Sequence, residues 1–137
     1  MKYNCVSYAM KLEEESNQDN LENLDWTLAP AEAVEAFAEK HGLLIRELED
    51  EHSILASKEW MIVFWGFIYI YDPDDYSEDF RSSFPDYHFA RKCEDGIWRE
   101  RMAWEKPIVP IDLYEKIKLF GAYGYKPKFF AIKKAED

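Results

Sequence analysis

The chain has 137 residues, which is enough for one domain of ordinary size, spanning residues 1–137, with a substantial core. It carries 17 basic and 28 acidic residues, and the formal net charge of −11 argues against direct binding to nucleic acid or to an anionic membrane. The same charge is compatible with a basic protein partner, with mimicry of nucleic acid, or with solubility alone. We therefore expect neither nucleic acid nor a membrane among the partners.

No targeting or membrane-spanning segment is expected. Residues 1–15 contain no continuous apolar run before the acidic residues begin. The longest apolar stretch, residues 60–71, is too short to cross a bilayer and is typical of a buried strand. A cytoplasmic location follows as the expectation, and the two cysteines should stay reduced there. Their isolated positions lack the spacing of zinc ligands, so no metal and no cofactor is expected.

Two helices are expected in the first third of the chain. Residues 5–15 repeat apolar side chains at a helical period, and Asn4 is in position for the N-cap. Residues 29–42 form a stronger pattern, which is rich in alanine. Pro30 lies in its first turn and Gly42 follows its last, as helix starts and ends prefer.

The remaining chain has the patterns of strands. The predicted strands are residues 43–49, 59–72, 87–93, 97–104 and 128–134. Gly66, inside the second of these, predicts a bulge or a close approach of another group to the backbone. Residues 111–120 are ambiguous and could include a short helix. Two helices followed by an antiparallel sheet of four or five strands define the α+β class.

An acidic segment, residues 72–79, separates two of the strands. Its carboxylates suggest a calcium loop, but the glycine and the terminal glutamate of an EF-hand are missing. A solvated loop is the expected structure.

Cys5 and His88 are the residues that suggest chemistry. Cys5 stands at the start of a predicted helix, where the positive end of the helix dipole favours a thiolate. His88 lies on a predicted strand just before a hairpin, and a histidine close to a thiol can act as its base. Against this, a free cysteine is among the residues most often buried, and a strand histidine is more often structural.

The two segments "NCVSYAM" and "DYHFARKCEDGIWRE" resemble motifs of a papain-like cysteine peptidase family of bacteria and phages. The element order is similar to the broader NlpC/P60-type class, with cysteine on the first helix, histidine on a strand and a polar orienting residue on the next strand. In this resemblance Cys5 takes the place of the nucleophile and His88 that of the base. The chain departs from the family after Trp98, where Glu100 replaces a second histidine and the Lys-Pro-Gly that follows is missing.

The resemblance implies a papain-like α+β domain that acts as a cysteine hydrolase, a peptidase or an amidase, on a peptide or protein substrate. Cys5 would attack a carbonyl, His88 would carry the proton, and Glu100 would hold the imidazole. The residues expected at the substrate and oxyanion site are Asn4, Tyr8 and Trp98. Asp72 and Asp86 are alternatives to Glu100 as the orienting acid.

The hairpin decides whether Glu100 can reach His88. If residues 94–96 form a three-residue loop with Gly96 in the left-handed conformation, Ala90 faces Glu100, and Glu100 shares the face of His88. A two-residue turn would shift the register by one and point Glu100 away. In either register Cys93 lies on the face opposite His88, which predicts a structural role for this second cysteine.

The alternative function belongs to a different class. The chain could keep the papain-like scaffold without catalysis and bind a basic partner through its net charge, as a phage-encoded inhibitor or a nucleic-acid mimic would. The residues that replace the family motif after Trp98 favour this alternative. Acyl transfer in place of hydrolysis is a third possibility that the sequence leaves open.

Overall fold

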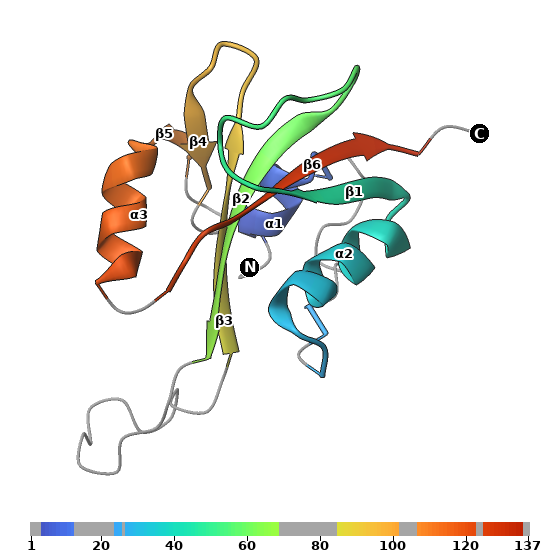
Figure 1. The fold of residues 1–137 in the computed structure, drawn as a ribbon, viewed down its shortest axis with the longest axis horizontal. Coiled ribbons are helices and arrows are strands. Elements are labelled where there is room, and N and C mark those ends of the chain that lie inside the picture. The colour runs from blue at the N-terminus through green and yellow to red at the C-terminus, as the bar shows by residue number, and fades with distance from the viewer. Residues whose placement is uncertain are drawn as a thin grey trace.

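The computed structural model describes residues 4–12, 24–25, 27–68, 85–101, 107–122 and 125–135. These residues form an α+β domain of three helices and one six-stranded antiparallel sheet (Figure 1). The helices are α1 (Asn4–Ala9), α2 (Pro30–Lys40) and α3 (Leu113–Gly121). The strands are β1 (Leu43–Leu48), β2 (Trp60–Ile68), β3 (Pro85–Lys92), β4 (Trp98–Glu100), β5 (Val109–Pro110) and β6 (Lys128–Lys134).

The expected α+β class is confirmed, with six strands where four or five were predicted. The additional strand is β5, which pairs with β4 and is too short to leave a pattern in the sequence. Helix α1 is shorter than predicted. It ends at Ala9, and Lys11 has a positive φ of 56°, which a continuing helix cannot accommodate. The predicted acidic loop at residues 72–79 lies outside the described residues.

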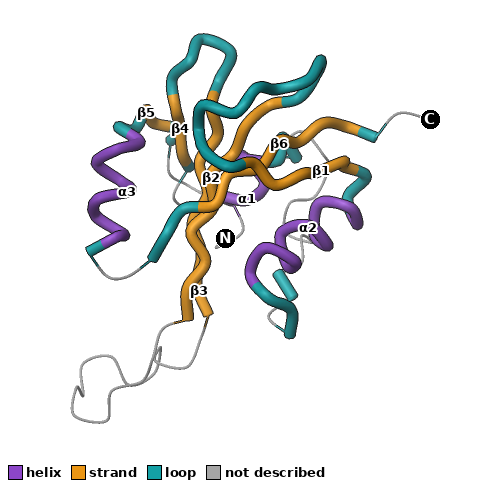
Figure 2. Tube along the Cα trace, viewed as in Figure 1, coloured by secondary structure: helices purple, strands orange, loops and turns teal. Residues whose placement is uncertain are grey.

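The sheet has the strand order β1-β6-β2-β3-β4-β5, so the C-terminal strand β6 is inserted between β1 and β2. Helix α2 lies at the β1 end of the sheet and α3 at the β4–β5 end (Figures 1 and 2). Both faces of strand β2 are covered by core clusters. This explains why its sequence is apolar without interruption from Trp60 to Trp65 and does not alternate with polar residues.

Two core clusters lie on opposite faces of this sheet. The first joins helices α1 and α2 to the even-numbered positions of β2, such as Ile62 and Phe64. The second joins α3 to the odd-numbered positions, such as Val63 and Trp65. Because successive side chains of a strand point to opposite faces, neighbouring residues in the middle of β2 and β3 face opposite clusters. This division determines which candidate residues can meet.

The β3–β4 hairpin adopts the three-residue loop. Arg91 pairs with Arg99, and Gly96 has a φ of 84°, in the left-handed region that favours glycine. The amide of Cys93 donates to the carbonyl of Ile97 at 2.9 Å, which closes the loop. The register is therefore the one that turns Glu100 toward the face of His88.

Candidate functional site

His88 lies in the middle of β3, on the face that α3 covers. Its register partner on β2 is Trp65, and the two rings stack with centroids 6.1 Å apart. The ring of Phe120, from α3, lies 6.0 Å away on another side. His88 is only 7% exposed, so packing and not solvent surrounds most of the imidazole.

Glu100 meets His88 as the hairpin register predicts. Nε2 of His88 lies 2.7 Å from Oε1 of Glu100, and Nζ of Lys116 lies 3.1 Å from the same oxygen. Burial by itself raises the pKa of the Glu100 carboxyl, but the hydrogen bond and charge of His88, together with Lys116, bring this pKa below its ordinary value. The carboxyl is therefore ionised, and Nε2 of His88 donates to it.

Cys5 lies on the other side of the sheet. It belongs to α1 and to the first core cluster, where it is 3% exposed. The β3 residues that contribute to this cluster are Tyr87 and Phe89, the two neighbours of His88. Because the side chain of His88 points the opposite way, toward Trp65 and α3, the structure does not bring Cys5 and His88 together.

The residues expected at the substrate and oxyanion site are also separated. Tyr8 lies on the α1 side, where its hydroxyl is 3.4 Å from Sγ of Cys93. Trp98 lies on the α3 side and packs edge-on against Phe129, with ring centroids 6.1 Å apart. Asn4 is the first residue of α1, and its side chain lies outside the described part of the chain.

The structure does not compare the alternative orienting acids with Glu100. Asp72 and the side chain of Asp86 lie outside the described residues. Glu100 is the acid that the structure places against His88.

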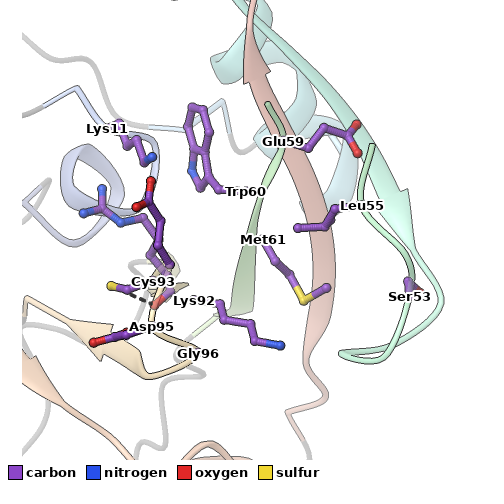
Figure 3. Close-up of a pocket in the computed structure, with 12 residues that line it drawn as sticks. Lys11, Ser53, Leu55, Glu59, Trp60, Met61, Lys92, Cys93, Asp95 and Gly96 are labelled. Carbon is purple, nitrogen blue, oxygen red and sulfur yellow. Dashed lines mark hydrogen bonds between the residues drawn. The ribbon is translucent and has the colours of Figure 1, made fainter. Parts of the chain in front are cut away.

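Cys93 is on the face opposite His88, as predicted, but its surroundings are polar. It lines a hollow of about 790 Å³ at the end of the sheet where β2 begins and β3 ends (Figure 3). Partial burial raises the pKa of the thiol, but hydrogen bonds from Tyr8, Arg99 and Arg91 outweigh it, and the pKa lies below its ordinary value. The guanidinium of Arg91 also covers the Tyr8 ring, 4.1 Å from its centroid.

Sequence reasoning missed Lys116 and the cluster around Cys93. Residues 111–120 were ambiguous in the sequence, and nothing in "YEKIKLF" shows that one lysine turns toward a carboxylate on β4. For Cys93, the sequence did contain a usable signal of a cationic environment. Arg91 lies two residues before Cys93 on the same strand, and Arg99 lies on the strand across the hairpin. Once the register is known, these side chains share a face.

Within the described ranges, no group of three or more His, Cys, Asp or Glu side chains is arranged to hold a metal ion. In the same ranges, no helix has the length and apolar character needed to cross a bilayer.

Comparison with known protein families, with curated proteins and with solved structures found no match to this chain. The argument for function therefore depends on the geometry of the residues themselves. That geometry contains a buried imidazole–carboxylate–ammonium group on one face of the sheet and two thiols on the other.

Proposed function

We propose that this protein is a non-enzymatic acidic domain that binds a basic partner. The observation that carries the proposal is the placement of Cys5 and His88 on opposite faces of the sheet, which removes the imidazole from reach as the base for this thiol. The formal net charge of −11 is then the property best suited to select a partner and to speed its approach.

Acidic side chains gather where the β1–β2 connection meets the start of α3. The hydroxyl of Tyr114 donates to Glu51 at 3.2 Å and joins the two segments. The carboxylates of these segments are Glu49, Asp50, Glu51, Asp112 and Glu115. Their concentration on two segments that meet at Tyr114 and Glu51 gives a cationic chain a local site of attraction in addition to the overall charge.

The test is a titration of the protein with a labelled peptide rich in lysine and arginine, followed by fluorescence anisotropy. Binding should weaken steeply as salt rises from about 50 mM to 500 mM, because screening shortens the reach of charges. Cys5→Ala should bind with the same affinity, and an acidic peptide of equal length should not bind. Equal binding of both peptides, or affinity independent of salt, would contradict the proposal.

A cysteine hydrolase on a papain-like scaffold is the second candidate. The observation that favours it is the 2.7 Å contact between His88 and Glu100, which reproduces the base and acid of a triad. The element order, with a cysteine helix before the antiparallel sheet, is compatible with the same scaffold. This function requires a rearrangement that carries Cys5 to the face of His88.

Turnover of peptide and isopeptide substrates tests the second candidate. The hydrolase predicts activity that Cys5→Ala and His88→Ala both abolish and that Cys93→Ser leaves intact. Absence of turnover over a broad substrate panel, with normal folding of all three variants, would exclude it.

A further inference from the structure

Exposed apolar side chains are not spread evenly over the described surface. Of the six large ones, four belong to the β4–β5–α3 end of the sheet: Ile97, Ile108, Tyr114 and Leu119. Tyr114 is 61% exposed and Leu119 is 53% exposed. Single exposed apolar residues are ordinary, but a group of them on one part of a surface marks an interaction site.

Two hollows lie beside three of these side chains. One, of about 500 Å³, is lined by Ile97 and Tyr114, and the other, of about 440 Å³, is lined by Leu119. Ile111 and Asp112 line both hollows and therefore lie between them. The apolar group and the hollows form one surface, which we call the α3 surface.

The α3 surface is acidic as well as apolar. The carboxylates that line the two hollows are Glu51, Glu100, Asp112 and Glu115, against the ammonium groups of Lys92 and Lys116. Lys116 is occupied by its contacts with Glu100, at 3.1 and 3.2 Å. The local balance is negative: Glu51 accepts from the hydroxyl of Tyr114 in one hollow, and Glu115 lines the other.

We propose that the α3 surface is the docking site for a basic amphipathic segment of another protein, an inference that rests on the proposed function. Apolar side chains of the segment would enter the two hollows, and its lysines or arginines would lie against Glu51 and Glu115. Charge complementarity selects this occupant. A second copy of the chain would oppose a net charge of −11 with an equal one, which disfavours self-association through this surface.

The experiment compares two probes of equal positive charge. The first is a labelled peptide of about fourteen residues with leucines on one helical face and lysines on the other. The second replaces every leucine with serine. The proposal predicts that the amphipathic probe binds about tenfold or more tightly than the polar one, because only the former can fill the hollows.

Matched variants locate the site. Tyr114→Ser combined with Leu119→Ser removes apolar surface from α3 without changing charge, and should weaken the amphipathic probe about tenfold. Leu44→Ser is the control, since Leu44 is 49% exposed on β1, the opposite edge of the sheet, and should leave binding unchanged. Glu115→Gln, a third variant on the surface of α3, should weaken both probes. Urea unfolding verifies that each variant is folded.

The outcomes separate this inference from the proposed function. Tighter binding of the amphipathic probe that depends on Tyr114 and Leu119 supports both. Equal, salt-dependent binding of the two probes, unaffected by the serine variants, would overturn the α3 surface as the docking site and leave the proposed function standing. Absence of salt-dependent binding by either probe would overturn both.

Discussion

At the scale of single residues, the Glu100 carboxylate joins three elements that are distant in sequence. It belongs to β4, accepts from His88 on β3 and contacts Lys116 on α3. A buried carboxylate is tolerated only when such donors surround it. This group therefore fixes α3 against the sheet, which is a structural role that requires no nearby thiol.

The stability of the folded protein should depend on the ionisation of Glu100. Its pKa in the folded state lies below the ordinary value of 4.5, so its contribution is complete above that pH and is lost as the pH falls through the lowered pKa. Glu100→Gln should lower the free energy of unfolding by about 1–3 kcal/mol at pH 7. Urea unfolding between about pH 7 and pH 3 should show this difference shrinking below about pH 4.5.

Glu115→Gln is the control for this measurement, because Glu115 is an exposed acid on α3, next to Lys116 in the sequence. Its effect on unfolding should stay within about 0.5 kcal/mol at every pH. A Glu100→Gln difference that does not change with pH would show that the lost interaction was not that of an ionised carboxylate.

Cys93 should be the more reactive of the two thiols. Tyr8, Arg91 and Arg99 favour its thiolate, and the acids on its own loop, Glu94 and Asp95, oppose it; Asp95 is itself bound by Arg99 at 2.9 Å. In a Cys5→Ala background, iodoacetamide should modify Cys93 with an apparent pKa below the ordinary 9.0, and Arg91→Gln should raise that value. An apparent pKa of Cys93 at or above 9.0, measured with Arg91 in place, would contradict this prediction.

The hairpin rules limited Glu100 to two alternatives, because strand alternation and loop length are local properties, and the structure adopts the three-residue loop that turns Glu100 toward His88. The same rules could not place Cys5 relative to His88. The helix that carries Cys5 and the strand that carries His88 are recognisable from sequence. The face of the sheet on which that helix packs, however, depends on contacts between distant segments. Lys116 was missed for the same reason.

At the scale of elements, β2 contains a glycine that its packing requires. A side chain at Gly66 would collide with the ring of Phe64, two residues earlier on the same face. Gly66→Ala should therefore lower the free energy of unfolding by about 1–3 kcal/mol, because the buried Phe64 ring would have to move. Chemical unfolding monitored by tryptophan fluorescence measures the loss.

Gly121→Ala is the matched change at the end of α3, where an added Cβ meets no atom within 4 Å. It should be neutral or stabilising by up to about 1 kcal/mol, since alanine favours the helix and restricts the unfolded chain. Equal effects of the two substitutions would show that Phe64 does not lie over Gly66.

The elements differ in how well the sequence predicted them. Helix α2 and strand β2 were predicted because each has a sustained pattern and clear terminal residues, such as Pro30 and Gly42 around the helix. Strand β5 has two residues and only β4 as a partner, so no periodicity could reveal it. Helix α1 ends early because Lys11 adopts a left-handed backbone conformation, which lysine rarely does.

At the scale of the whole molecule, the pattern of helices followed by strands was sufficient for the α+β class. The insertion of β6 between β1 and β2 was not predictable, because pairing between distant strands leaves no mark in either strand alone. The net charge argues against some classes of partner but does not by itself identify one. The distribution of exposed apolar residues, visible only in the folded chain, supplies the remaining specificity at the α3 surface.

The alkylation of Cys5 is the measurement that shows whether Cys5 and His88 face different sides of the sheet. In a Cys93→Ser background, we would measure the rate of Cys5 modification by iodoacetamide across pH, with and without His88→Ala. Phe120→Ala is the control for changes in stability. It loosens the packing around His88 on the α3 side of the sheet and leaves the imidazole itself in place.

If the two residues lie on opposite faces, modification of the buried Cys5 should be slow, because the core must first open, and His88→Ala should not change its apparent pKa. A rapid reaction with an apparent pKa well below about 8.5, removed by His88→Ala but not by Phe120→Ala, would show that thiol and imidazole meet. That result would contradict the arrangement described above and restore the cysteine hydrolase as the leading function.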